Sequence, residues 1–524
     1  MTHVPWSKSR ARDPTPSIGN IGMLLSAILM LLASALSSPA SAAPAGKVPS
    51  QKVRNFIYVV PNGFGPASQT LWRDYISIIN KNGTELRPNS TATELDRIMI
   101  GTVRTQSFDK FVTDSAAAAT AFATGHKTHN TGVGIDSDVK PVASVLEAAH
   151  LEGFKTGLVV TSRVTDATPA GFCAHVMDRN LEVEIASHQI GQKHPLGSVV
   201  DLIMGGGRRH YQTQRPGGNR TIDLITWAKG QGFSYAGNKR ELEVFSRDLG
   251  KVPLPFLGLF ADSHMAYELD RDNEKEPSLL QMVQIAIKTL TDATMPGKDG
   301  INRPKGFFLT IEASRIGHAG HANDVAAHIH DIAMYYEVMS FLRKFATQNP
   351  DTQILSAADH ETGGLTLATG YNPAMLERAN HTSEYLERAF ALYQGPDRAT
   401  YLRNVILPQY GLLSASDKDV KKYLDVLKRD GISEMGSAIR RDFAKSAGIT
   451  WATDSHSAVD VAMYGFAAGD KAYSQMKASL GPHADNTQLA RYMESALGVS
   501  LNKATEALRE NWIKFEGYGG KGGK

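Results

Sequence analysis

The sequence contains one cysteine, Cys173, among its 524 residues. A single thiol excludes any disulfide within the chain, so we expect a hydrophobic core rather than covalent bridges to hold the fold. An excess of charge of one sign is also lacking, because 56 Lys and Arg residues nearly balance 53 Asp and Glu residues, leaving a net charge of +3. Such a small excess gives no basis for nucleic acid or an anionic membrane surface as a partner.

Long hydrophobic runs are scarce, and the clearest one lies near the N-terminus, from Ile21 to Leu36. It follows the basic residues Lys8, Arg10 and Arg12, and the small residues Ala40-Ser41-Ala42 come after it. The run is shorter than the roughly 20 residues of a membrane span. The pattern predicts a signal peptide over residues 1–42. A retained signal anchor, which would attach the protein to a membrane, is the alternative.

A secretory route is the expected localisation, with a secreted, vacuolar or membrane-associated protein as the end point. Four Asn-x-Ser/Thr tripeptides, at Asn82, Asn89, Asn219 and Asn380, are compatible with glycosylation on that route. We expect residues 511–524, which are rich in Gly and Lys, to form a flexible tail. No hydrophobic stretch typical of a GPI signal is found there.

Short apolar runs recur along the chain, and a polar motif follows each of them. The runs lie at 56–60, 156–160, 202–204, 307–311 and 353–355. Continuous apolar runs of this length are typical of parallel strands that are buried on both faces. Stretches with helical character lie between them, for example 142–151 and 279–290. The sequence therefore predicts one doubly wound α/β domain over residues 43–510, with ligands gathered at the carboxyl ends of the strands.

The segment from about 371 to 450 interrupts this alternation. It is rich in charged residues at helical spacing, as in 418–428 and 439–445. Charge runs of this kind most often form a solvated helix face. We therefore expect an inserted helical cap.

The stretch Val112-Thr113-Asp114-Ser115, followed by four alanines, predicts a helix that begins at Ser115, with Asp114 or Ser115 near the N-cap. A hydroxyl at this position lies at the positive end of the helix dipole, where a phosphate oxygen could use the free amides. An ordinary buried alanine-rich helix with a capping Asp fits this stretch equally well.

The longer motif, which continues to Ala123-Thr124-Gly125-His126, resembles the nucleophile motif of the alkaline phosphatases. Further blocks similar to that family follow in the same order over nearly the whole mature chain, among them Thr165–Ala170, Ala174–Arg179, Ile311–Asp324 and Ala358–Gly364. The resemblance implies hydrolysis of small phosphate monoesters through a phosphoserine. It also implies two Zn²⁺ ions, one Mg²⁺ ion and a homodimer.

The resemblance assigns a role to each matching residue. Ser115 matches the nucleophile, and Arg179 matches the guanidinium that clamps phosphate. Asp114, Asp166 and His318 match residues around the phosphate and the magnesium. The matching metal ligands are Thr168, Glu312, His321, Asp359, His360 and His456.

Two positions depart from the family pattern, and they fall on different expected metals. Asn62 stands where the family has an aspartate that bridges zinc and magnesium, and Gly317 stands where it has an aspartate on the other zinc. An amide carries no charge, and glycine offers no side chain. A metal-depleted relative that binds phosphate with little turnover is therefore the alternative function.

The N-terminal segment gives the first testable prediction. If the Ala40-Ser41-Ala42 site is cleaved, N-terminal sequencing of the mature protein will begin at or near Ala43. An intact Met1 on a membrane-bound protein would instead identify residues 21–36 as an anchor.

Overall fold

The computed structural model describes residues 53–80, 92–214, 221–247, 250–295 and 305–519. All of them belong to one compact unit. The predicted signal segment and the tripeptides at Asn82, Asn89 and Asn219 lie outside the described ranges, whereas Asn380 is exposed. No helix in the described ranges has both the length and the apolar character needed to cross a bilayer.

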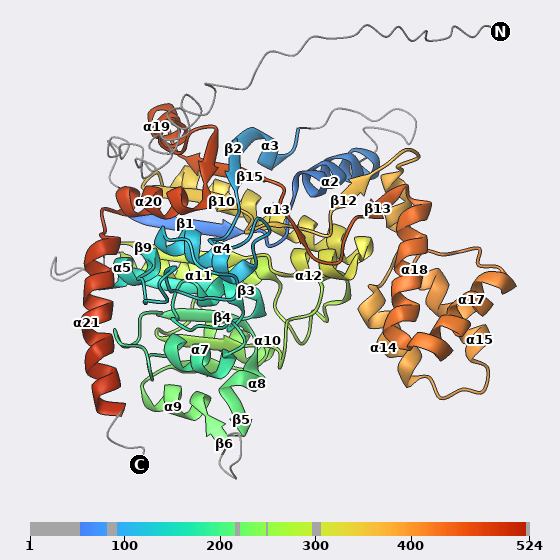
Figure 1. Ribbon diagram of the computed structural model, residues 1–524, viewed down its shortest axis with the longest axis horizontal. Coiled ribbons are helices and arrows are strands. Elements are labelled where there is room, and N and C mark those ends of the chain that lie inside the picture. The colour runs from blue at the N-terminus through green and yellow to red at the C-terminus, as the bar shows by residue number, and fades with distance from the viewer. Residues whose placement is uncertain (1–52, 81–91, 215–220, 248–249, 296–304, 520–524) are drawn as a thin grey trace, which may run out of the picture. The chain divides into compact units, whose positions relative to one another are not determined.

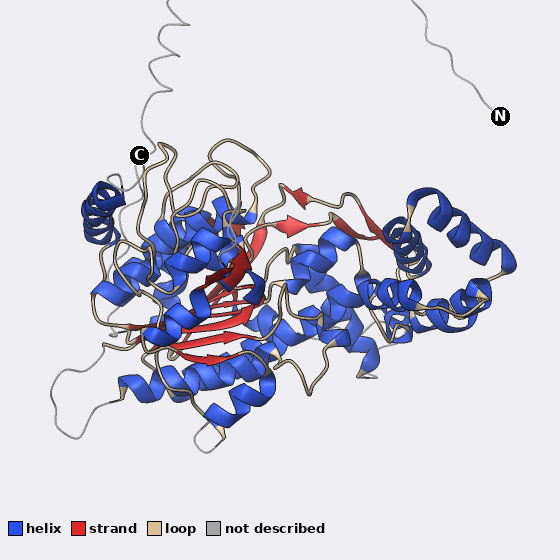
Figure 2. Cartoon of the chain, turned by 90° about the horizontal axis from the view of Figure 1, so that it is seen from below, coloured by secondary structure: helices blue, strands red, loops and turns tan. Residues whose placement is uncertain are grey.

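Ten strands of the described residues form one sheet, in the order β16-β2-β15-β10-β1-β9-β3-β4-β8-β7. Helices pack around this sheet, which Figure 2 shows in red. The strand bounds are β1 Asn55–Val60, β2 Met99–Arg104, β3 Lys155–Arg163, β4 Leu202–Gly206, β5 Gln212–Gln214, β6 Thr221–Asp223, β7 Ser234–Ala236, β8 Phe256–Leu259, β9 Phe307–Glu312, β10 Thr352–Ala357, β11 Glu361–Thr362, β12 Leu365–Leu367, β13 Ile449–Trp451, β14 His456–Ser457, β15 Val461–Ala467 and β16 His483–Asp485.

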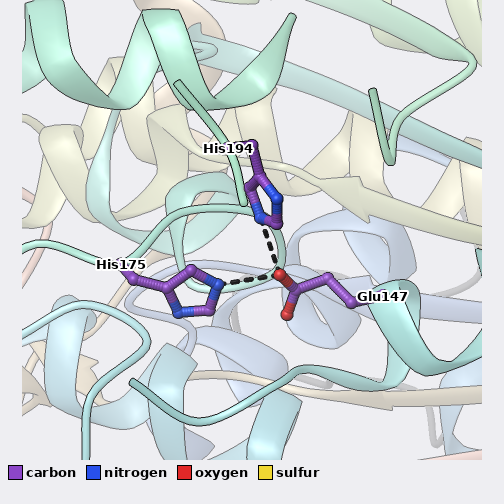
Figure 3. Close-up of side chains that lie close together, drawn as sticks. All are labelled: Glu147, His175 and His194. Atoms are coloured by element: carbon purple, nitrogen blue, oxygen red, sulfur yellow. Dashed lines mark hydrogen bonds and ion pairs between the residues drawn. The ribbon is translucent and has the colours of Figure 1, made fainter. Parts of the chain in front are cut away.

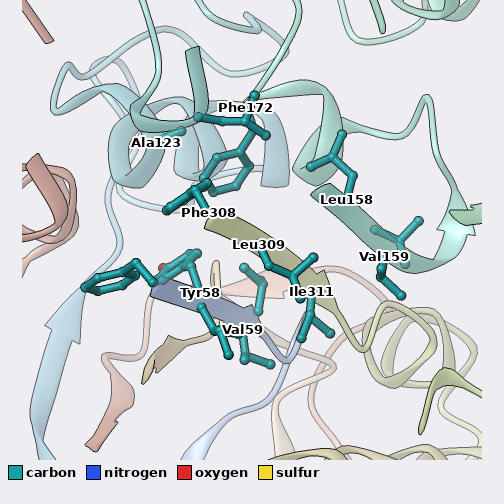
Figure 4. Close-up of a cluster of buried hydrophobic side chains, with 14 of the residues drawn as sticks. Tyr58, Val59, Ala123, Leu158, Val159, Phe172, Phe308, Leu309 and Ile311 are labelled. Carbon is teal, nitrogen blue, oxygen red and sulfur yellow. The ribbon is translucent and has the colours of Figure 1, made fainter. Parts of the chain in front are cut away.

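The centre of the sheet is parallel and fully buried, as the apolar runs predict. β1 lies between β9 and β10, and all three strands are buried along their whole length. Figure 4 shows aromatic and branched side chains, including Tyr58, Phe308 and Leu309, packed together around β1 and β9. The exception is β15, which is antiparallel to both β10 and β2. The observed sheet therefore confirms the predicted mostly parallel α/β fold.

The register of the central strands aligns their carboxyl ends. Val60 of β1 and Val160 of β3 both pair with Glu312, the last residue of β9. The chain therefore leaves these strands along one edge of the sheet, and the loops that follow them meet there.

The helices alternate with the strands and cover the sheet (Figure 1). Their bounds are α2 Pro66–Ile79, α3 Glu94–Ile98, α4 Ser115–Thr124, α5 Val145–Leu151, α6 Ala167–Ala170, α7 Glu182–Gln189, α8 Arg208–Tyr211, α9 Leu224–Gly230, α10 Lys239–Ser246, η1 Glu268–Asp270, α11 Leu279–Thr294, α12 Arg315–Ala322, α13 Val325–Gln348, η2 Pro373–Arg378, α14 Ser383–Leu392, α15 Arg398–Tyr401, η3 Leu402–Ile406, α16 Leu407–Gln409, α17 Asp417–Asp430, α18 Ile432–Ser446, α19 Asp470–Leu480, α20 Asn486–Leu497 and α21 Leu501–Gly519.

Residues 373–446 are mostly helical and pack in a second hydrophobic core, which they share with α2 and α13. η2 and α14–α18 lie here, and Figure 1 shows α14, α15, α17 and α18 grouped together in orange. Phe390, Tyr410 and Phe443 are fully buried in this second core, and the charged residues of α17 are mostly exposed. The segment predicted as a helical cap is therefore a helical layer that packs on α2 and α13 beside the sheet.

The C-terminal helix α21 overlaps the segment that we expected to be a flexible tail. The helix continues to Gly519, and residues 520–524 lie outside the described ranges. Leu508 is fully buried, and Trp512 packs against the main core. This packing explains why the helix continues past residue 510.

A buried polar cluster lies beneath the sheet loops, formed by Glu147, His175 and His194 (Figure 3). Both imidazole Nε2 atoms approach Glu147 Oε1, at 2.8 Å from His175 and 2.7 Å from His194. The amide of Leu196 donates to His194 Nδ1, so the hydrogen of that ring is on Nε2. His175 Nδ1 faces the carbonyl of Gly134, so this ring needs a hydrogen on both nitrogens.

These protons make the cluster an ion pair rather than a metal site. Burial lowers the pKa of His175, but the charge of Glu147 outweighs it and raises that pKa. Burial likewise raises the pKa of Glu147, but His175 and His194 outweigh it and hold the carboxyl pKa well below its usual range. Val176, next to His175, bridges to Val133. The ion pair of His175 with Glu147 therefore holds the segment that leads to Arg179 in place.

The second prediction concerns the pH dependence of stability in Glu147→Gln. The stabilisation of the fold by the ionised Glu147 carboxylate is complete above its ordinary pKa of 4.5. It is lost as the pH falls towards the depressed pKa of this group in the folded state. The stabilisation by the protonated His175 is complete below its ordinary pKa of 6.5. It is lost as the pH rises through the raised pKa of this group in the folded state.

We therefore expect Glu147→Gln to lower the free energy of unfolding most between these two values, by about 3–5 kcal/mol. Urea denaturation from acidic to alkaline pH measures this difference. The control is Glu152→Gln, which removes an exposed carboxylate that pairs with Lys305 and should cost less than about 1 kcal/mol. A loss that does not vary with pH would contradict the ion pair.

Candidate active site

Ser115 is the first residue of α4, as predicted, and Asp114 is its N-cap. The Asp114 carboxylate accepts a hydrogen bond from the amide of Ala117 at 3.0 Å. Ser115 is only 5% exposed, and its Oγ lies 3.0 Å from His360 Nε2. The hydroxyl thus lies at the positive end of a helix and within hydrogen-bond distance of the His360 imidazole.

Arg179 is held between two carboxylates that face Ser115. Its guanidinium donates to Asp114 Oδ2 at 3.2 Å and to Asp166 Oδ1 at 2.9 Å. Burial raises the pKa of Asp166, but the positive charges of Arg179 and Arg163 outweigh burial and hold this pKa well below its usual range. These contacts fix the planar fork of Arg179 before an anion arrives.

A cavity of about 230 Å³ collects most of the predicted residues. Its lining includes Ser115, Asp166, Thr168, Arg179, Glu312, His318, His321 and His456, together with Asn62, Ser162 and Ser314. Residues separated by more than 300 positions in the sequence thus surround one space. Asp114 contributes through Arg179, and Asp359 and His360 do not line the cavity.

Asp359 and His360 lie in the turn after β10, as their adjacent positions in the sequence require. Both are fully buried, and Asp359 Oδ2 lies 3.1 Å from His360 Nε2. Burial raises the pKa of Asp359, but His360 and an amide hydrogen bond from Gly63 outweigh it and lower that pKa to about 2. By contrast, burial raises the pKa of Glu312 to about 7, with Asp166 and Asp359 adding to the shift.

His321 and His456 form a pair whose geometry fits a divalent cation. His321 Nδ1 lies 2.7 Å from the carbonyl of Asp454, and His456 Nδ1 lies 2.8 Å from the carbonyl of Thr113, so both rings have a hydrogen on Nδ1. Their Nε2 atoms face each other at 3.1 Å. Burial lowers the pKa of both rings, to about 2 for His456. Two imidazole nitrogens on one tetrahedral zinc ion stand about 3.3 Å apart.

The second expected zinc and the magnesium fit the arrangement less well. Asn62 Nδ2 donates to Asp359 Oδ2 at 2.8 Å and to Glu312 Oε1 at 3.1 Å, and it lies 3.5 Å from Thr168 Oγ1. An N–H group thus occupies the place where a cation would face these ligands. In this arrangement the carboxylates of Asp359 and Glu312 accept hydrogen bonds from the protein instead of binding a metal ion.

Sequence reasoning missed Ser162 and Ser314, which line the cavity, and also Arg163 and His264, which contact residues of its wall. Arg163 ends β3 and pairs with Asp166 at 3.1 Å. It also contacts His264 Nε2, and the ring of His264 lies 4.1 Å from that of His318. Burial lowers the pKa of His264 to about 3. The position of Arg163 at the end of a predicted strand was a signal for the site, whereas nothing in the local sequence marks His264.

His328, which lies close to His321 in the sequence, has a structural role. Its Nε2 lies 2.9 Å from Ser68 Oγ, and its Nδ1 lies 3.0 Å from the carbonyl of Ile316. It is fully buried and lines neither cavity. Of these two histidines, only His321 therefore belongs to the site.

A larger groove of about 810 Å³ begins where the smaller cavity ends, because His318 and His321 line both. Its far wall comes from α14 and α18 of the helical layer, with Glu384, Glu434 and Arg441 among its residues. Asp454 also lines this groove and does not line the smaller cavity.

Comparisons with known proteins agree with this arrangement. The family model described as alkaline phosphatase matches residues 53–499. The chain is 35% identical to the repressible alkaline phosphatase of Saccharomyces cerevisiae, over 97% of this chain and 93% of the relative. It is also 35% identical to an alkaline phosphatase of Schizosaccharomyces pombe, over 88% of this chain and 84% of the relative.

Among solved structures, the alkaline phosphatase of Thermus thermophilus superimposes with a TM-score of 0.71 at 27% identity, covering 90% of this chain and 99% of that one. The fold and the cavity define a hydrolase-like α/β protein with a serine at a helix N-terminus and a guanidinium facing it. The chain belongs to the alkaline phosphatase family.

The third prediction separates two roles of Asp114, as helix cap and as partner of Arg179. Asp114→Ala removes the cap of α4 and one partner of Arg179. We expect it to lower the free energy of unfolding by about 0.5–2 kcal/mol and to weaken binding of inorganic phosphate, because Arg179 is less well oriented. Chemical denaturation and isothermal titration calorimetry measure the two effects.

The matched control is Asp223→Ala, which removes the cap of α9. This variant should lose a similar amount of stability and bind phosphate as the wild type does. Equal phosphate affinity in all three proteins would contradict the positioning role of Asp114.

Proposed function

We propose that this protein is a phosphatase that hydrolyses phosphate monoesters, with Ser115 as its nucleophile. The observation that carries the proposal is the position of Ser115. Its hydroxyl lies at the start of α4, against His360 Nε2, and in one cavity with Arg179. Membership of the alkaline phosphatase family supports the same activity.

The residues of the cavity have different roles in the proposed reaction. Arg179 binds two oxygens of the phosphate and orients its phosphorus towards Ser115. The Ser115 oxygen forms the bond to phosphorus as the ester bond breaks, the alcohol leaves with the electron pair of that bond, and the proton of Ser115 passes through solvent to the leaving oxygen. Water then cleaves the phosphoserine, which releases inorganic phosphate and restores the hydroxyl.

A divalent cation held by His321 and His456 would supply positive charge beside the phosphate. We propose zinc for this pair because imidazole nitrogens suit that ion. The leaving alcohol would extend into the larger groove, since His318 and His321 line both spaces. A groove with mainly polar walls favours substrates whose alcohol is itself polar.

A protein that binds phosphate without useful turnover is the second candidate. The observation in its favour is the amide of Asn62, which donates to the carboxylates that would otherwise hold cations. Turnover of a chromogenic phosphate ester, measured beside phosphate affinity, separates the two. Tight binding with no turnover at any pH would favour the second candidate.

The cellular setting is also a proposal. The N-terminal pattern and the exposed Asn380 support a secretory route that ends in secretion, in the vacuole or at a membrane. We propose a homodimer, as the family resemblance implies. Sedimentation and a glycosidase digest test these two points.

The fourth prediction tests the nucleophile. Ser115→Ala should abolish turnover of a phosphate ester and remove any acid-stable phosphoserine, because no other hydroxyl contacts His360 Nε2 among the described residues. The rate of hydrolysis and mass spectrometry of acid-quenched enzyme measure this. The control is Ser198→Ala, which changes an exposed serine outside both cavities. Unchanged turnover in Ser115→Ala would exclude the proposed nucleophile.

A further inference from the structure

Asn62 and Gly317, the two positions that depart from the family pattern, are in contact. Gly317 lies in α12, and a Cβ at this position would stand 2.0 Å from Asn62 Oδ1 and 3.0 Å from Asn62 Cγ. The amide oxygen of Asn62 thus occupies the space that a Cβ at 317 would need, and it would have to move to admit a side chain there. The expectation that the two departures affect different metals is therefore incomplete, because they form one packing unit.

The other end of the same amide faces two carboxylates. Its nitrogen carries two hydrogens, and its acceptors are Asp359 Oδ2 at 2.8 Å and Glu312 Oε1 at 3.1 Å. If the amide were turned over, Oδ1 would face both carboxylates with no hydrogen between the oxygens. A cation between them, or a proton taken up by Glu312, would be needed to stabilise that arrangement. The observed orientation is the one that is stable without a cation.

The remaining oxygens of these carboxylates also have donors. Glu312 Oε2 accepts hydrogen bonds from Ser162 Oγ at 3.1 Å and from Ser314 Oγ at 2.5 Å. Asp359 Oδ1 accepts two backbone amides, at 3.1 and 3.0 Å. Both side chains are buried, so unpaired oxygens would be costly. Hydrogen bonds from the protein satisfy all four oxygens.

We infer that the amide of Asn62 takes the place of the cation between Glu312 and Asp359, and that Gly317 provides the space which this amide requires. The two N–H groups supply the positive poles that a bridging metal ion would otherwise supply. The inference concerns the site of the proposed function but does not depend on turnover. It implies that an aspartate at position 62 would bring a third carboxylate into the site and make the site dependent on a cation.

The test measures how Mg²⁺ changes the melting temperature of Asn62→Asp and of the wild type after EDTA treatment. Mg²⁺ is the probe because it prefers oxygen ligands, so the imidazoles of His321 and His456 respond to it weakly. We expect Mg²⁺ to raise the Tm of Asn62→Asp by about 3 °C or more and to leave that of the wild type nearly unchanged. Asn502→Asp, which adds the same charge at an exposed position of α21, is the control and should behave as the wild type does.

A double-mutant cycle tests the contact between the two positions. Alanine is normally favoured over glycine inside a helix, so a loss of stability in Gly317→Ala would reflect the clash with Asn62 Oδ1. We expect Gly317→Ala to lower the Tm in the wild-type background and to lower it less, or raise it, in the Asn62→Ala background. Equal losses in both backgrounds would show that the two residues are not coupled.

The inference is overturned if Mg²⁺ raises the Tm of the wild type as much as that of Asn62→Asp. Ser115→Ala distinguishes this failure from failure of the proposed function. That variant loses its turnover if the proposed function is correct, yet its response to Mg²⁺ should match the wild type because Ser115 contacts neither carboxylate.

Discussion

The structure of the site depends on how two buried carboxylates, Glu312 and Asp359, are neutralised. Leaving either charge buried without a partner would cost several kcal/mol. The chain meets this constraint with hydrogens rather than with charge, through hydroxyls, backbone amides and the side-chain amide of Asn62. Burial still raises the pKa of Glu312 to about 7, so hydrogen bonds offset only part of the cost for this group.

The sheet register brings these groups together. Val60 and Val160 pair with Glu312, so β1 and β9 end at the same height, and β3 continues past them to Arg163 at the same edge of the sheet. β10 lies on the other side of β1 and ends just before Asp359. Continuous apolar runs made these strands predictable, because a strand buried on both faces has no polar alternation. β15 was missed, although its residues are nearly all buried, because it runs antiparallel and no polar motif follows it at the site edge.

Most of the residues singled out from the sequence lie around one cavity, but the sequence did not reveal the contacts between distant segments. The start of α4 at Ser115 follows from local capping and helix propensity, and both can be recognised from the neighbouring residues alone. The contact between Asn62 and Gly317 joins residues about 250 positions apart, and each substitution alone looks like the loss of a ligand. Similarly, the charge of His175 arises from partners at Gly134 and Glu147 that only the fold brings together. Local pattern identifies which residues carry chemistry, but their protonation and pairing require the tertiary structure.

The helical layer and the sheet edge line different parts of the site. The phosphate cavity is built from groups at the sheet edge, whereas α14 and α18 supply the far wall of the larger groove. These helices pack in a core around Phe390 and Phe443 that they share with α2 and α13, and neither Ser115 nor Arg179 belongs to that core. Binding energy from the alcohol half of a substrate would therefore be set by the layer, and charge at the phosphate by the sheet edge. Under the proposed function, reaction at phosphorus needs only the groups at the sheet edge, so changes at groove residues such as Glu434 and Arg441 would alter the choice of alcohol without altering the mechanism.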